Sequence, residues 1–178
     1  TDGYLDAGIA ATPLENEAIK ERPLYYEPFV GFVSEQHRLF SKEHIHEEDL
    51  DIDDILLLED GHCFTNSVIN ICNNKIDTDR QSFQLESGSI NTLVKLSKEG
   101  LGMTLIPYLH TLDLSDDDQK LLKQFSNTVP AREVSLIYHK SQLKMQLIEV
   151  LKTTIDGVIR GAITFQDVKI VSPLNKNM

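Results

Sequence analysis

Short apolar runs, each bounded by turn-forming residues, recur along this chain and alternate with segments of helical periodicity. The runs have the length and composition of strands that are buried on both faces. They are Leu5 to Ala11, Pro28 to Ser34, Asp54 to Glu59, Ser82 to Glu86, Met103 to Ile106 and Glu133 to Tyr138. Alternating strands and helices predict an α/β protein whose parallel strands are joined by crossover helices.

Two of the helical patterns are well delimited. Ser89 is a suitable N-cap for a helix that begins at Ile90, and Gly100 and Gly102 end this helix before the next strand. The longest pattern covers residues 141 to 163 and places its apolar residues on one side of the helix. These are Leu143, Leu147, Val150, Leu151, Ile155, Val158 and Ile159.

Length and charge restrict the class of protein. The 178 residues, 40% hydrophobic and 25% charged, suffice for one core or for two small α/β lobes. No apolar run reaches the roughly 20 residues that span a bilayer, and the first residues lack the features of a secretory signal, so we expect a cytoplasmic protein without membrane partners. The net charge of −11 would repel a phosphate backbone, so this part of the protein is not expected to bind DNA itself.

The segment LLLEDGHCFTNSVINIC, residues 56 to 72, carries the two cysteines. It reads as a strand, a turn with His62 and Cys63, and a helix for which Thr65 is a candidate N-cap. Backbone N–H groups at the helix start, together with a protonated His62, would favour a Cys63 thiolate. Cys72 shares an apolar stripe of this helix with Phe64, Val68 and Ile71 and is expected to face the core.

Helix geometry limits what this pair of cysteines can do. Nine positions of helix separate Cys63 from Cys72 by about 13 Å along the axis. A disulfide requires Cα atoms within roughly 7 Å, so a bond between them requires residues 64 to 71 to unwind. Oxidation of Cys63 to a sulfenic acid and condensation with Cys72 would drive such a change. The spacing alone favours an ordinary interpretation, with Cys72 as a small core hydrophobe and Cys63 as an incidental turn residue.

The run LEDGHC at Leu58 to Cys63, with Cys72 nine positions further on, resembles the signature of OxyR-type regulators of the LysR family. Residues 23 to 40, 88 to 107 and 132 to 140 resemble LysR-type regulatory domains in order and spacing. The resemblance implies two Rossmann-like lobes with an interlobe cleft, as in periplasmic binding proteins. Lobe I would comprise residues 1 to 27 and 134 to 178 and lack its N-terminal part, and lobe II would comprise residues 28 to 133 with the redox cysteines.

The resemblance also implies a function that is regulatory and not enzymatic. Hydrogen peroxide would oxidise Cys63, Cys72 would resolve the product as a disulfide, and His62 and Arg132 would favour the thiolate. The signal would alter contacts in a homodimer or homotetramer and reach DNA through a winged helix-turn-helix outside this chain. A cellular disulfide reductant and RNA polymerase are further implied partners, whereas no cofactor or metal is implied.

The sequence departs from the family pattern in two respects. Family threonines that help hold peroxide are expected before Thr1, and the acidic residue that follows the sensing cysteine in the family is Asn66 here. The complete peroxide pocket is therefore not expected within these residues.

Three other interpretations remain open at this point. A LysR-type effector domain could bind a metabolite through hydroxyl groups of Ser87, Ser89 and Thr92 at a helix N-terminus. A thiol peroxidase could use Cys63, although no thioredoxin-type motif surrounds the pair. A metal site could be formed by the acidic and imidazole cluster of His44, His46, Glu47 and Glu48.

Overall fold

The computed structural model describes residues 5–58, 63–72, 86–163 and 168–174. The strands are β1 (Gly8–Thr12), β2 (Ile19–Phe32), β3 (His44–Ile45), β4 (Leu57–Leu58), β5 (Glu86–Ser87), β6 (Thr104–Pro107), β7 (Leu122–Phe125), β8 (Val129–His139) and β9 (Val168–Ile170). The helices are α1 (Cys63–Ile71), α2 (Ile90–Lys98), α3 (Tyr108–Thr111), α4 (Asp116–Gln119) and α5 (Met145–Ile159), with short 3-10 turns η1 (Glu47–Asp49) and η2 (Ile52–Asp54).

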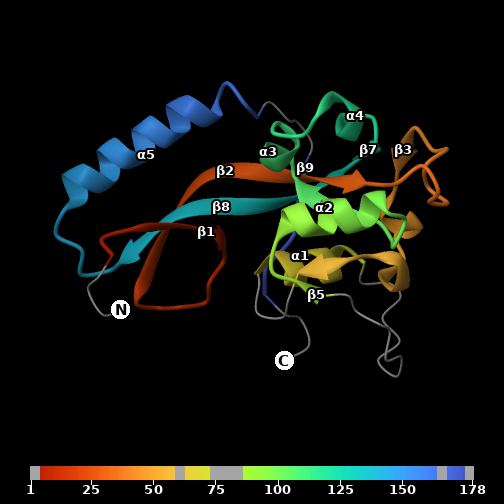
Figure 1. The fold of residues 1–178 in the computed structure, drawn as a ribbon. Coiled ribbons are helices and arrows are strands. Elements are labelled where there is room, and N and C mark those ends of the chain that lie inside the picture. The colour runs from red at the N-terminus through yellow and green to blue at the C-terminus, as the bar shows by residue number, and fades with distance from the viewer. Residues whose placement is uncertain (1–4, 59–62, 73–85, 164–167, 175–178) are drawn as a thin grey trace.

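A long antiparallel ribbon of β2 and β8 runs through the molecule (Figure 1). It carries β1 and α5 toward one end and α1 to α4 toward the other. Its register extends from the pair Ile19 and His139 to the pair Pro28 and Ala131. From Phe29 onward β2 pairs instead with β6, and near its end also with β7, so one continuous strand links the two groups of elements. The division into lobes at residues 27/28 and 133/134 remains a prediction.

The strand pairing differs from the parallel arrangement expected from the sequence. β3 with β7, β4 with β5 and β8 with β9 are parallel pairs. In contrast, β2 is antiparallel to β6, β7 and β8, and β1 is antiparallel to β8. The reason is topological, because the chain runs outward along β2 and returns along β8, which places the two long strands side by side in opposite directions.

The observed β2 begins nine residues before the predicted run at Pro28. Residues 19 to 26 are half-exposed or exposed, whereas residues 27 to 32 are buried without interruption. Only the second part therefore has the apolar composition of a buried strand, and the first part forms a strand because it pairs with β8. The other predicted strands agree within a few residues where they are described, while residues 82 to 85 and Glu59 lie outside the described part.

The α2 helix follows the sequence prediction. Ser89 occupies the N-cap position with an extended backbone (φ −150°), although its side chain makes no capping hydrogen bond. The helix ends before Gly100 and Gly102, which have positive φ angles of 82° and 151°. A Cβ atom on Gly102 would lie 2.6 Å from the carbonyl oxygen of Asp54. Glycine is therefore required at 102 both for its backbone angle and for the close approach of the neighbouring segment.

The α5 helix is shorter than the predicted span of residues 141 to 163 and contacts β2. Ile148 is its buried residue, whereas much of the predicted apolar side is exposed. The exposed members of that side are Leu143, Leu147, Val150, Leu151 and Val158. Among the helices of the described ranges, none is long and apolar enough to cross a membrane.

The principal core lies at the other end of the ribbon, around α1. It joins side chains of α1 to β2, β4, α2 and the strand region before β6, with Phe29, Leu57, Leu93 and Met103 among its members. Cys72 and Val171 belong to the same cluster. The helix that carries the cysteines is therefore a central part of the packing.

Candidate functional site

The α1 helix begins at Cys63, in agreement with the sequence prediction. Its hydrogen bonding continues past Ile71, because the amide of Cys72 donates to the carbonyl of Val68 at 3.1 Å. The Cys63 side chain and the whole of His62 lie outside the described part of the structure. Their predicted roles therefore remain predictions, whereas the helical backbone between the two cysteines is established.

Thr65 is not the N-cap that the sequence indicated. The helix starts two residues earlier, so Thr65 lies within the first turn, where its side chain is buried. A buried hydroxyl requires a hydrogen-bond partner, and Thr65 Oγ1 donates to the carbonyl of Leu58 at 3.0 Å. This bond attaches the first turn of α1 to the end of β4.

The predicted apolar stripe of α1 is confirmed. Phe64, Val68, Ile71 and Cys72 are between 1% and 6% exposed. Because nine helical positions separate Cys63 from Cys72, their Cα atoms lie about 13 Å apart along the axis, beyond the span of a disulfide. This conformation keeps Cys72 as a free, buried thiol.

The pKa of the Cys72 thiol is raised from 9.0 to about 12, first by burial and then by the negative charges of Asp54, Asp51 and Glu47. A thiolate at this position would be both desolvated and repelled. Cys72 is therefore protonated at neutral pH and a poor nucleophile while α1 remains folded.

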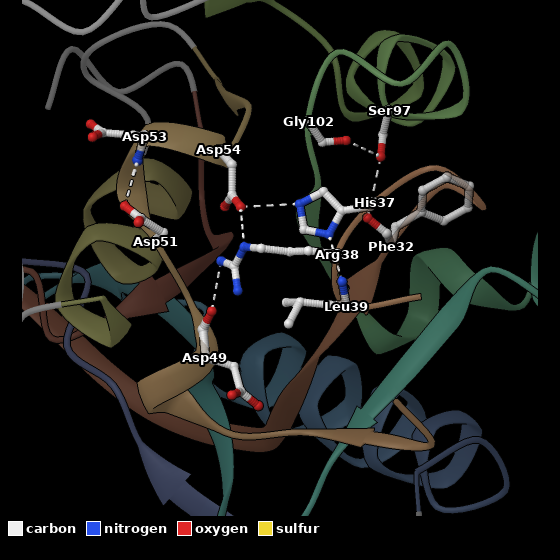
Figure 2. A network of polar contacts seen from close by, with 10 residues as sticks. All are labelled: Phe32, His37, Arg38, Leu39, Asp49, Asp51, Asp53, Asp54, Ser97 and Gly102. Carbon is white, nitrogen blue, oxygen red and sulfur yellow. Dashed lines mark hydrogen bonds and ion pairs between the residues drawn. The ribbon is translucent and has the colours of Figure 1, made fainter. Parts of the chain in front are cut away.

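A polar network fixes Asp54, the first of these charges (Figure 2). Its Oδ2 atom lies 3.1 Å from Nε2 of His37 and 2.9 Å from Nε of Arg38. The amide of Leu39 donates to His37 Nδ1 at 3.2 Å, so in the neutral ring Nε2 carries the proton and donates to Asp54. Arg38 also donates to the carbonyl of Asp49 at 2.8 Å, which ties the network to η1.

Arg132, predicted to favour the thiolate, lies beside the first turn of α1. Its guanidinium carbon is 5.9 Å from the ring centroid of Phe64, the residue that follows Cys63. Its Nε and Nη2 atoms donate to Oε2 of Glu27 at 2.9 and 2.7 Å. The fold thus brings together residues of β2, α1 and β8 that are far apart in the sequence.

Glu27 was not among the site residues predicted from the sequence. It is 3% exposed and stands directly across the ribbon from Arg132. The available signal was an acidic residue at the start of an otherwise apolar strand, since buried carboxylates require a partner. Its partner lies 105 positions away, and spacing cannot reveal such a pair.

The structure places only some of the residues that the alternative interpretations would use. The Ser87 side chain lies outside the description, and Thr92 is exposed. His44 is exposed in β3, whereas His46 shares a hydrogen bond with Ser126. Within the described ranges, no group of three or more histidine, cysteine or acidic side chains is arranged to hold a metal ion.

The family description "LysR substrate binding domain" matches residues 1–157. The chain therefore belongs to the family of proteins that carry a LysR substrate binding domain, and the expected periplasmic-binding-protein-like α/β fold is confirmed.

Within this family, the chain resembles OxyR proteins. It is 31% identical over 140 residues to the "Probable hydrogen peroxide-inducible genes activator" of Mycobacterium leprae, covering 79% of this chain and 45% of that protein. It is 30% identical over 159 residues to the "DNA-binding transcriptional dual regulator OxyR" of Escherichia coli, covering 87% of this chain and 52% of that protein. The chain thus spans about half the length of these relatives, which are transcriptional regulators and not enzymes.

A solved structure shows the same relationship. The crystal structure of OxyR from Porphyromonas gingivalis superimposes with a TM-score of 0.82 at 29% identity, over 95% of this chain and 77% of that one. The resemblance to OxyR-type regulators that the LEDGHC run indicated is confirmed by sequence and fold together.

Proposed function

We propose that this chain is the peroxide-sensing regulatory domain of a transcription factor and that Cys63 and Cys72 form its switch. The Cys63 thiolate attacks one oxygen of hydrogen peroxide, the O–O bond breaks, and the products are a Cys63 sulfenic acid and hydroxide, which is protonated to water. The Cys72 sulfur then attacks the Cys63 sulfur and displaces the sulfenic hydroxyl, which leaves as a second water with the Cys72 thiol proton. The product is a disulfide between Cys63 and Cys72. Peroxide is the oxidant throughout.

The observation that carries this proposal is the placement of both cysteines on one intact, buried helix. Cys63 occupies the first position of α1, and Cys72 extends the helix into the core. Since an intact α1 holds them about 13 Å apart, the disulfide can form only after the helix unwinds. A covalent bond is thereby coupled to a change in packing.

Unwinding of α1 has consequences beyond the helix. The Phe64, Val68 and Cys72 side chains would leave the main core. The hydrogen bonds that Asn70 donates to the carbonyls of Ser172 and Leu174 would also break, which releases the segment after β9. The reduced conformation is therefore held by many contacts that the oxidised one cannot keep, which makes the switch bistable.

The partners follow from the same proposal. We infer a homodimer or homotetramer whose contacts change on oxidation, DNA contact through a separate winged helix-turn-helix domain, a response passed to RNA polymerase, and resetting by a cellular disulfide reductant. The setting that suits a reducible pair is the cytoplasm. His62 and Arg132 would favour the Cys63 thiolate.

A second candidate is a metabolite-responsive domain with ordinary cysteines. It is favoured by the family description, which names substrate binding. Such a domain would be stabilised against heat by its ligand to the same extent in the wild type and in Cys63→Ser.

The decisive experiment treats the reduced protein with near-stoichiometric hydrogen peroxide. Non-reducing peptide mass spectrometry should find a bond between Cys63 and Cys72, and far-UV circular dichroism should record a loss of helix. Cys72→Ser should stop at the sulfenic acid, which a dimedone probe traps, and Cys63→Ser should not react. Unmodified thiols, or an over-oxidised Cys63 without a bridge, would contradict the proposal.

A further inference from the structure

Glu27 is a buried carboxylate that connects three elements. Its Oε2 atom accepts hydrogen bonds from Nε and Nη2 of Arg132 on β8, and its Oε1 atom accepts one from the amide of Leu109, in the first turn of α3, at 3.2 Å. A carboxylate that is 3% exposed requires such partners, because an unpaired buried charge is strongly unfavourable. Both oxygens of Glu27 are therefore held by defined donors.

We propose that Glu27 is the positioning residue of the redox site: it holds the Arg132 guanidinium against the first turn of α1 and limits, through its own charge, how strongly Arg132 favours a Cys63 thiolate. The inference rests on the proposed function of Cys63. Glu27 would take no part in the reaction with peroxide itself.

The geometry explains the positioning. A single oxygen of Glu27 receives two N–H groups from one edge of the guanidinium, which fixes the orientation of its plane. In this orientation the guanidinium carbon lies 5.9 Å from the Phe64 ring centroid. Among the described residues Glu27 is the hydrogen-bond acceptor of the Arg132 guanidinium, so its loss would remove the bonds that orient this side chain.

The charge of Glu27 has a second, electrostatic effect: it opposes the favourable effect of the Arg132 charge on a Cys63 thiolate. A neighbouring carboxylate cancels part of the field of the guanidinium. Tyr25, on the same strand, also feels both charges: burial raises its pKa, Glu27 raises it further, and Arg132 lowers it. Tyr25 therefore remains neutral near physiological pH and does not mask a change in the field of Arg132.

These two effects can be separated by measurement of Cys63 in a Cys72→Ser background, where Cys63 is the remaining thiol. The pH profile of alkylation by iodoacetamide reports the thiolate, and the rate constant with hydrogen peroxide at pH values above the midpoint reports the orientation of the site. In Glu27→Gln the alkylation midpoint should move downward by at least about half a pH unit, because the guanidinium is no longer compensated. The peroxide rate constant should fall about tenfold, because a neutral amide oxygen orients the guanidinium less firmly than the carboxylate does.

The matched control is Glu21→Gln. Glu21 lies on the same strand, and its carboxylate accepts a hydrogen bond from the amide of Leu14 at 2.8 Å, away from α1. The control should change neither the midpoint nor the rate constant. In Arg132→Gln, the further change Glu27→Gln should have little effect on the peroxide rate constant, because Glu27 positions the site through Arg132.

Three results would overturn the proposal. They are a Glu27→Gln protein with the midpoint and rate constant of the wild type, additive effects of Glu27→Gln and Arg132→Gln on the peroxide rate constant, and a midpoint shift of equal size in Glu21→Gln. If Glu27→Gln does not fold, Glu27→Asp decides, since it keeps the charge but shortens the side chain. Its midpoint should stay and its peroxide rate constant should fall, and an unchanged rate constant would refute the positioning role.

Failure of the proposed function is distinguishable from failure of this inference. Alkylation requires no peroxide, so its midpoint tests the effect of Glu27 on the thiol directly. A wild-type protein that forms no disulfide with peroxide, but shows the expected midpoint shift in Glu27→Gln, would refute the sensor and retain the coupling of Glu27 to Cys63.

Discussion

The ring of Phe64 lies 5.7 Å from the ring of Phe29, centroid to centroid, with the two planes inclined by 55°. Both side chains are buried, and the contact joins the first turn of α1 to β2. Tilted aromatic pairs of this kind are favourable beyond the area that they bury. The start of the helix is therefore held by packing as well as by the Thr65 hydrogen bond.

Phe64→Ala should destabilise the reduced protein more than the oxidised one. Removal of a buried phenylalanine costs about 3 to 5 kcal/mol, but only in a state in which the ring is buried. If oxidation unwinds α1, the loss measured by urea denaturation should be smaller in the disulfide form. Phe40→Ala is the control, because Phe40 packs on the same core from outside α1 and should cost the same in both forms. Equal losses for Phe64→Ala would argue against unwinding.

The Cys72 thiol predicts a pH dependence of stability. Its pKa in the folded state, about 12, lies above its ordinary value of 9.0, so the folded state retains the proton after the unfolded state has lost it. The resulting stability is complete below pH 9 and is lost as the pH rises toward 12, by up to about 1.4 kcal/mol per pH unit. Denaturant titrations of the reduced protein should show a steeper decline over this range than those of Cys72→Ala. Parallel declines would place the Cys72 thiol in a more polar setting.

Asn70 should hold the segment after β9 against α1. Its side-chain nitrogen donates to the carbonyls of Ser172 and Leu174 at 2.9 and 2.8 Å. Asn70→Ala should reduce the free energy of unfolding by about 1 to 2 kcal/mol. Hydrogen exchange should accelerate at the Val171 amide, which donates to Ala131 at 2.7 Å. Asn91→Ala, an exposed substitution on α2, is the control and should leave this exchange unchanged.

Gly102 and Gly157 should respond in opposite directions to alanine. At Gly102 the new Cβ would lie 2.6 Å from the Asp54 carbonyl oxygen, on a backbone with a φ of 151°, so a loss of at least about 2 kcal/mol is expected. At Gly157, inside α5, nothing lies within 4 Å, and alanine should stabilise the helix by up to about 1 kcal/mol. Thermal denaturation of both variants checks the prediction. A tolerated Gly102→Ala would show that the Asp54 segment can move away.

Local features of α1 and α2 could be predicted from sequence because they depend on neighbours along the chain. The helix start at Cys63, the stripe of Phe64, Val68, Ile71 and Cys72, and the cap at Ser89 follow from periodicity and capping within one or two turns. Thr65 shows the limit of this reasoning. Its hydroxyl was compatible with a cap or a first-turn position, and the carbonyl of Leu58 decided between them.

The sequence by itself thus determined that a helix separates Cys63 from Cys72 by more than a disulfide can span, because helical rise depends only on the number of residues. Only the tertiary structure decided the pairing of β2 with β8, the exposure of the apolar side of α5, and the meeting of Glu27 with Arg132. These features depend on segments about a hundred residues apart. Contacts between such segments are set by how the whole chain packs, and no local pattern encodes them.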